Sequence, residues 1–326
     1  MRRRDFVKTV VSSVAVWPVL VHAQQLKQRR IGILTALDDA QIKTRIAPML
    51  EELERLGWID GRNIRIDLRA ASGDAEVIRK HGLEMLSTTP DLLVAFGNGP
   101  TDYLVRATRT VPIIFTIVTD PLGAGFVKNL ARPGGNATGF MLFEYSLSGK
   151  WLDLLKQMSP NLKRVAIIRD PILGSGIGQF AVIQATAPSL GLEITAVNVR
   201  DRSEMTETIT AFSEFPNGGL VVTAGPVSAL NREFIIGLAA RHKLPTIYFE
   251  RFFATAGGLI SYGPSFDDEL RNTAHYVDRV LKGEKPGDLP VQAPTKYQLV
   301  INLKTAKAAG VAVPRPLLER ADEIIE

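Results

Sequence analysis

Short apolar runs alternate with amphipathic stretches along the first half of the chain. The apolar runs predict strands at residues 31–35, 64–69, 92–97 and 113–118. Between them, apolar residues at three- and four-residue spacing predict a helix over 41–56, ended by Gly57, and further helices near 75–87 and 101–107. Strands that alternate with helices in this way indicate a parallel sheet joined by helical crossovers.

The same order of elements begins again at residue 163. Strands are predicted at 163–169, 192–199, 219–223 and 246–249, with helices near 178–190, 203–215 and 228–242. Two such series predict an α/β protein with two doubly wound parallel-sheet lobes. In each lobe the carboxyl ends of the strands should meet at one edge, and the two edges can face each other across a cleft.

The last part of the chain connects the two lobes again. It contains a glycine-bounded strand at 257–263, a helix at 266–281, three closely spaced prolines, and a strand and helix at 297–301 and 303–309. Because prolines favour extended connections, we expect the chain to cross three times at the hinge. Lobe 1 is predicted to comprise 29–143 plus 257–290, and lobe 2 144–256 plus 291–326.

Residues 1–23 have the pattern of an export signal. Three arginines precede an uncharged run from Thr9 to Val21, and Ala23 ends a small-residue cleavage site. The run holds about thirteen residues, fewer than the roughly 20 that span a bilayer, so no permanent membrane anchor is expected. The protein should act in the periplasm. The Arg3-Arg4-x-Phe6-x-Lys8 pattern also resembles the twin-arginine motif, which leaves both the Tat and the Sec routes open.

Composition and the lack of certain motifs exclude several functions. The formal charge is +5, of which the signal carries +3, and no basic block remains that would suit a nucleic-acid partner. Cysteine is absent, which excludes disulfides and thiolate chemistry. No complete dinucleotide, phosphate-loop or nucleophile-elbow motif occurs, and the histidines lie far apart along the chain. We therefore expect no cofactor, no metal site and no enzyme activity.

Four segments, in order, resemble a known family. They are TDPLGAG at 119–125, ARPGGNATG at 131–139, AGGLISYG at 256–263 and PTKYQLVINLKTA at 294–306. They resemble the periplasmic substrate-binding proteins of ABC importers, of the tryptophan/tyrosine type, which have the type I periplasmic-binding-protein fold. The resemblance implies capture of a small-molecule ligand in the cleft between the lobes and delivery to the permease transmembrane subunits. A receptor that engages a signalling protein is the alternative.

The resemblance does not identify the ligand. Amino-acid-binding members tend to place Thr or Ser after the glycine that closes the third strand, where this chain has Asn98. They also tend to have an acidic–amide pair where the third strand of lobe 2 ends, and this chain has Thr223-Ala224-Gly225 there. An aromatic amino acid is therefore one of several candidate ligands.

Candidate ligand contacts lie where predicted strands end. Backbone N–H groups at Asn98 and Gly99 can hold an anion at a helix start, Asp120 can hold an ammonium group, and Arg169 can pair with a carboxylate. Each also has a structural interpretation as a turn, a cap or a surface residue. The expected contacts are Leu37, Asp38, Asn98, Gly99, Thr119, Asp120, Phe143, Arg169, Ser175, Gly225, Phe249, Glu250 and Tyr262.

Overall fold

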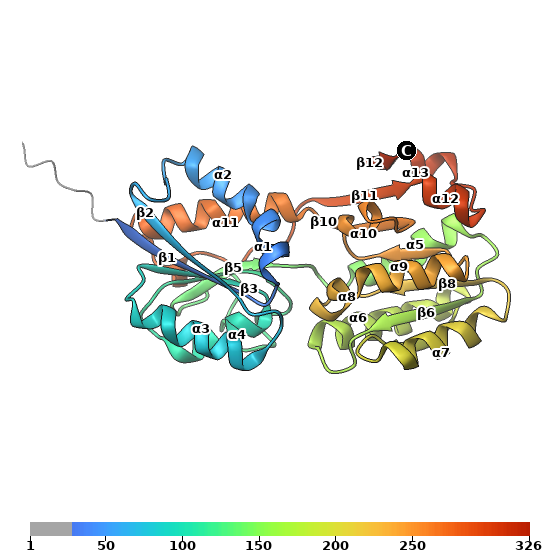
Figure 1. Cartoon of the computed structure of the whole chain (residues 1–326), viewed down its shortest axis with the longest axis horizontal. Coiled ribbons are helices and arrows are strands. Elements are labelled where there is room, and N and C mark those ends of the chain that lie inside the picture. Colours follow the sequence, from blue (N-terminus) through green and yellow to red (C-terminus); the bar gives the residue numbers. More distant parts are fainter. Residues whose placement is uncertain (1–27) are drawn as a thin grey trace, which may run out of the picture.

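The computed structural model describes residues 28–326, so the predicted export signal lies outside the described residues. Two lobes lie side by side along the long axis (Figure 1). The sheet of lobe 1 has five parallel strands in the order β2-β1-β3-β4-β5. They are β1 (Arg29–Thr35), β2 (Ile64–Ala70), β3 (Leu92–Phe96), β4 (Ile113–Val118) and β5 (Ala137–Met141).

Helices cover both faces of this sheet. Helices α2 (Ala47–Arg55) and α11 (Phe266–Leu281) pack on one face, and α3 (Ala75–Ser87) and α4 (Asn98–Ala107) pack on the other (Figure 1). The single helix predicted over 41–56 is instead two, because α1 (Asp39–Arg45) ends before α2 begins. Pro48 lies in the first turn of α2, and its ring and missing N–H favour a helix start there over a helix interior.

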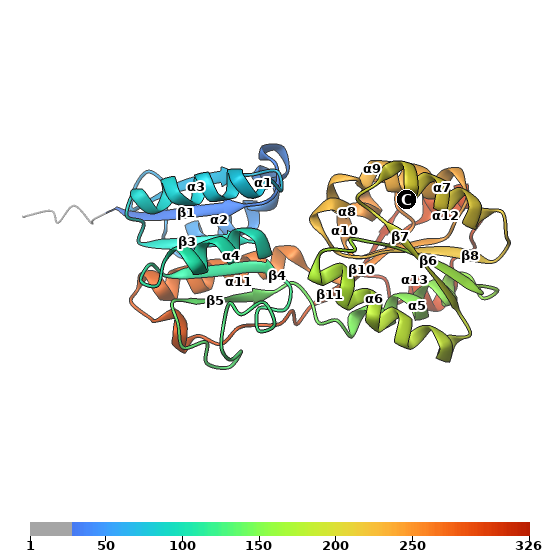
Figure 2. The same cartoon turned by 90° about the horizontal axis from the view of Figure 1, so that it is seen from below.

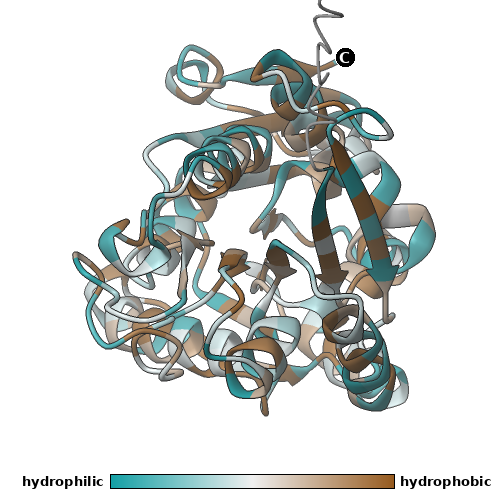
Figure 3. Ribbon diagram, turned by 90° about the vertical axis from the view of Figure 1, so that its left-hand side faces the viewer, coloured by the Kyte–Doolittle hydropathy of each residue, from teal (hydrophilic) through white to brown (hydrophobic). Residues whose placement is uncertain are grey.

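Lobe 2 has a seven-stranded sheet in the order β12-β11-β10-β9-β8-β6-β7, in which only the β10–β11 pair is antiparallel. The strands are β6 (Arg164–Arg169), β7 (Glu193–Asn198), β8 (Gly218–Val222), β9 (Thr246–Tyr248), β10 (Ile260–Pro264), β11 (Tyr297–Asn302) and β12 (Glu323–Ile325). Viewed along the long axis with lobe 1 toward the viewer, hydrophobic strand segments lie near the centre with helices around them (Figure 3).

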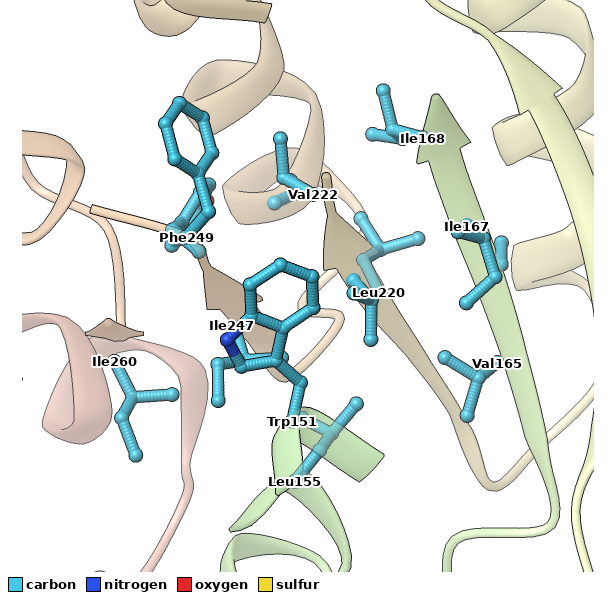
Figure 4. Packing of buried hydrophobic residues seen from close by; sticks show 14 of the residues in the cluster. Trp151, Leu155, Val165, Ile167, Ile168, Leu220, Val222, Ile247, Phe249 and Ile260 are labelled. Carbon is cyan, nitrogen blue, oxygen red and sulfur yellow. The ribbon is translucent and has the colours of Figure 1, made fainter. Parts of the chain in front are cut away.

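The core of lobe 2 is built on the helix that follows β5. The side chains of Trp151 and Leu155 on α5 face Leu220 and Ile247 of the sheet, and all four are fully buried (Figure 4). The indole N–H of Trp151 donates to the carbonyl of Tyr262 at 2.7 Å. The helices of this lobe are α5 (Leu147–Met158), α6 (Gly174–Thr186), α7 (Arg202–Ser213), α8 (Pro226–Leu230), α9 (Arg232–Arg241), α10 (Arg251–Thr255), α12 (Leu303–Ala309) and α13 (Arg315–Leu318), with 3-10 turns at Ala187–Leu190 and, beside lobe 1, Pro286–Asp288.

The chain passes between the lobes three times: after β5, between β10 and α11, and through residues 291–296. The predicted boundaries need two corrections. The sequence predicts β10 within lobe 1, but β10 pairs with β9 and β11 inside the sheet of lobe 2. The sequence predicts Gln292 within lobe 2, but its N–H donates to the Gly139 carbonyl of β5 at 2.9 Å, and its carbonyl accepts from the N–H of Met141 at 2.8 Å. The third crossing is therefore anchored on lobe 1.

A candidate ligand-binding cleft

A cavity of about 130 Å³ lies between the lobes, at the carboxyl ends of the strands of both sheets. This is where open α/β sheets bind ligands. Lobe 1 contributes residues that follow β1, β3 and β4, and lobe 2 contributes residues that follow β6, β8 and β9. The lining residues are Ala36, Leu37, Arg45, Phe96, Gly97, Asn98, Gly99, Ile117, Thr119, Leu142, Leu173, Ser175, Ala224, Gly225, Pro226, Ala229, Phe249, Glu250 and Phe266.

Asn98 joins the ends of β3 and β4. Its side-chain N–H donates to the Thr119 carbonyl at 2.9 Å, and its Oδ1 accepts from the Thr119 N–H at 2.9 Å and hydroxyl at 3.1 Å. The preceding Gly97 has φ +85°, a conformation that glycine adopts without strain. The Asn98 amide therefore organises the wall of lobe 1, and Gly97, Asn98 and Gly99 at the start of α4 line the cavity.

The end of β4 has an unusual backbone. Ile117, which lines the cavity, has φ +58°, a region that β-branched residues rarely occupy. Its N–H donates to Glu269 Oε1 at 2.8 Å, and the Thr116 hydroxyl donates to the same oxygen at 3.1 Å. Burial raises the pKa of Glu269 to about 7, although both hydrogen bonds oppose the shift.

Helices α4, α6, α8 and α10 begin at the cavity without side-chain caps, and α4 and α6 are the two longer ones. Neither α4 nor α6 has a side-chain cap or an acidic residue in its first turn, whereas Asp74 and Asp201, which do not line the cavity, cap α3 and α7. The first N–H groups of a helix have no partner within the helix. In α6, Ser175 is only 2% exposed and lines the cavity, and its Oγ has no hydrogen-bond partner among residues 28–326. These donors suit an anionic ligand group.

An ion pair crosses the cleft. Arg45, at the end of α1, lies 2.8 Å from the carboxylate of Glu250 in lobe 2. The guanidinium also lies over the rings of Phe252 and Phe266, at 4.5 and 5.2 Å from their centroids. Glu250 is 6% exposed, and burial raises its pKa to about 7 against the opposing effect of Arg45.

The rest of the cavity is mainly apolar. Phe96, Phe249 and Phe266 contribute rings, and Leu37 and Leu173 contribute aliphatic walls. The volume is close to the roughly 150 Å³ of a cavity that holds benzene. Such a site can enclose an apolar or aromatic body while helix starts and charged groups contact its polar end.

Comparison with known proteins identifies the family of this chain. The family model described as ABC transporter substrate binding protein matches residues 30–325. The chain belongs to this family. A tyrosine-binding protein of Clostridioides difficile (strain R20291) is 27% identical over 288 residues, which are 86% of this chain and 81% of that protein.

Solved structures show the same two-lobed fold. A conserved domain protein from Vibrio cholerae is 26% identical, with a TM-score of 0.84 over 91% of this chain and 100% of that one. An ABC domain from Streptococcus pneumoniae in complex with L-Trp is 25% identical, with a TM-score of 0.83 and the same coverage of both chains. The protein is thus an ABC transporter substrate-binding protein with the type I periplasmic-binding-protein fold.

Eight predicted contacts line the cavity of this substrate-binding protein: Leu37, Asn98, Gly99, Thr119, Ser175, Gly225, Phe249 and Glu250. All follow strands at the facing edges of the two sheets. The remaining five lie elsewhere.

These five residues have structural partners outside the cavity. The carbonyl of Asp38 accepts from Ile42 at the start of α1, and Asp120 Oδ1 accepts from the N–H of Gly123. Phe143 is buried against Tyr145, Arg169 lies over the ring of Phe180, and Tyr262 stacks on Tyr297 in the neighbouring strand. These five residues therefore do not line this cavity.

Some lining residues were not expected. Ala224 is next to the predicted contact Gly225, and Ile117 and Leu173 lie two positions before Thr119 and Ser175. The rule that contacts lie at strand ends therefore comes close to these three residues. Strand ends do not point to Arg45 and Phe266: Arg45 is the last residue of α1, well beyond the end of β1, and Phe266 begins α11, which follows a strand of the other lobe.

A larger hollow of about 430 Å³ lies beside α11 and the third crossing. The residues that follow β6, β8 and β9 do not line it, and several of its charged side chains are in ion pairs: Lys296 with Asp268 at 3.0 Å, and Arg279 with Glu284, outside the lining, at 2.7 Å. It is therefore a weaker candidate than the cleft. Within residues 28–326, no helix is long and apolar enough to cross a membrane, and no group of three His, Asp or Glu side chains is placed to hold a metal ion.

Proposed function

We propose that this substrate-binding protein captures a small carboxylate with an apolar or aromatic body, amino acids of this kind included, for the transmembrane subunits of an ABC importer. The observation that carries the proposal is the cleft itself. Its walls are largely apolar, and the uncapped starts of α4 and α6, with the buried hydroxyl of Ser175, supply donors for one anionic end. The eight lining residues predicted from the sequence would contact this ligand.

The relatives favour an amino acid within this class. One is a tyrosine-binding protein and another was solved with L-Trp. The wall at Ala224, Gly225 and Pro226, however, offers no polar side chain that could hold an α-amino group. Glu250 is the acidic group in the cavity lining, and Arg45 already pairs with it. Comparing the binding of amino acids with that of the matching acids that lack the amino group therefore shows whether the ligand needs an α-amino group.

Export completes the proposed role. Residues 1–23 would direct the chain to the periplasm, through the Tat route if the arginine pair is recognised. The family match favours transport over the signalling alternative. No covalent step is required, because closure around the ligand is sufficient for recognition by a permease.

The test is a thermal-shift and calorimetry panel on the exported protein. It contains L-Trp, L-Tyr, L-Phe and L-Leu, then indole-3-acetate and phenylacetate, and finally glucose and adenosine. A ligand at 100 times its Kd should stabilise the fold by about 2.7 kcal/mol. Ser175→Ala should weaken binding, whereas Ser189→Ala on the surface should not. Binding restricted to uncharged compounds would contradict the proposal.

A further inference from the structure

Ile117 contacts both halves of the molecule. It packs against the hydrophobic core of lobe 2 and also against the core beneath α2 and α11 in lobe 1, and it lines the cavity between them. The register of β4 against β5 shifts between Phe115 and Val118, on either side of it. The side chain therefore occupies the seam where the two lobes and the ligand cavity meet.

The backbone conformation that puts Ile117 there is strained. A left-handed φ of +58° is unfavourable for a β-branched residue and persists only where surrounding groups enforce it. Glu269 contacts this segment directly: its Oε1 accepts from the N–H of Ile117 at 2.8 Å and from the hydroxyl of Thr116 at 3.1 Å. Glu269 lies in the first turn of α11, directly after the second crossing.

Stability alone does not explain a carboxylate at this place. Glu269 is buried, and its Oε2 has no hydrogen-bond partner among the described residues. A buried carboxylate with an unpaired oxygen is costly. It lines the larger hollow beside α11 and not the cleft cavity, so it can influence a ligand in the cleft only through the residues that it holds.

We propose that Glu269 is a positioning residue for ligand capture: it holds Ile117 in the left-handed conformation that places this side chain in the cavity wall between the lobes. The proposal rests on the proposed function for its affinity measurement. The effect of Glu269 on the backbone at Ile117 can be measured without a ligand.

The experiment compares Glu269→Ala and Glu269→Gln with the wild type. Glutamine keeps an oxygen that can accept from Ile117 and Thr116, so its ligand Kd should stay near the wild-type value. Alanine removes the acceptor and should raise Kd roughly tenfold or more, the factor that corresponds to about 1.4 kcal/mol. Glu54→Gln, at an exposed acidic residue on α2 of the same lobe, is the matched control and should change nothing.

Two further measurements separate positioning from a structural role. Hydrogen exchange of a peptide covering residues 113–120 should be faster in Glu269→Ala and unchanged in Glu269→Gln. Glycine adopts positive φ without strain, so Glu269→Ala should have little further effect on Kd in an Ile117→Gly background. A lower Tm with unchanged Kd and exchange would overturn the proposal. If no compound in the panel binds the wild type, the proposed function fails, and unchanged exchange in Glu269→Ala would still overturn the role of Glu269.

Discussion

Arg45 in lobe 1 and Glu250 in lobe 2 form an ion pair of 2.8 Å across the ligand cleft. The pair is poorly exposed, and the guanidinium also lies over the rings of Phe252 and Phe266. Since its partners belong to different lobes, the contact exists only when the lobes are close together. It therefore stabilises the closed arrangement more than the folding of either lobe.

Replacing Arg45 should weaken ligand capture. In Arg45→Ala the carboxylate of Glu250 stays buried without its partner, a loss on the order of 1–3 kcal/mol, so Kd measured by calorimetry at pH 8 should rise about tenfold or more. Arg106→Ala removes an exposed ion pair with Asp102 in the same lobe and should leave Kd unchanged. Equal affinities for Arg45→Ala and the wild type would show that the pair does not hold the lobes together.

Folding stability and ligand affinity should change with pH in opposite directions. Burial raises the pKa of Glu250 to about 7, above the 4.5 of an exposed glutamate. Its contribution to folding stability is therefore complete below about pH 4.5 and lost as pH rises through 7. Attraction to Arg45 needs the ionised form, so ligand affinity should rise from pH 6 to pH 8.

Two variants test these signs. Between pH 5 and pH 8, the free energy of unfolding of the wild type, measured with urea, should fall by up to about 3 kcal/mol more than that of Glu250→Gln. The increase in affinity between pH 6 and 8 should disappear in Arg45→Ala, because no cation is left at that position. An affinity that falls with pH in the wild type would contradict the role of the ion pair.

Asn98 should matter for stability as well as for binding. Asn98→Ala leaves the N–H, hydroxyl and carbonyl of Thr119 without their partner in a residue that is 7% exposed. Unpaired buried polar groups cost about 1–3 kcal/mol, which chemical denaturation can measure. Thr119→Val removes only the hydroxyl bond, so its loss should be smaller. A larger loss in Thr119→Val than in Asn98→Ala would show that Asn98 does not organise this wall.

The sequence predicts the central strands well because they are covered on both faces. Strand β4, IIFTIV, and strand β8, GGLVV, are nearly continuous apolar runs, and the structure confirms both within a residue. Strand β5, ATGFM, was not predicted, because its residues are mostly small or polar. Its Gly139 is required by tertiary contact: a Cβ there would lie 1.8 Å from the carbonyl oxygen of Phe115. Such a requirement leaves no periodic pattern.

The same limit applies to the cleft. The rule that ligands bind at strand ends brings Asn98, Ser175 and Glu250 to one cavity from three separate segments. It cannot say which way a side chain points, and Tyr262 and Arg169 stack on neighbouring rings instead. Arg45 meets Glu250 only because the hinge brings two lobes together across about two hundred residues of sequence, and no local pattern records that distance.

A substitution at Gly263 tests the role of β10, the strand that precedes the second crossing. A Cβ at this position would lie 1.8 Å from the carbonyl oxygen of Phe249 and 2.9 Å from its carbon, and both are backbone atoms that cannot rotate away. Because Phe249 and Glu250 line the cavity, Gly263→Ala should displace that wall. We expect a loss of about 1–3 kcal/mol in unfolding free energy and weaker ligand binding in calorimetry.

The control is the same substitution in an open position. Gly237 is exposed in the interior of α9, and nothing lies within 4 Å of a Cβ placed there. Alanine is favoured over glycine in a helix by up to about 1 kcal/mol, so Gly237→Ala should stabilise the protein and leave Kd unchanged. Two chemically identical changes should therefore shift Tm in opposite directions. If Gly263→Ala behaved like Gly237→Ala, then the close approach of β10 to Phe249 would not set the shape of the cleft.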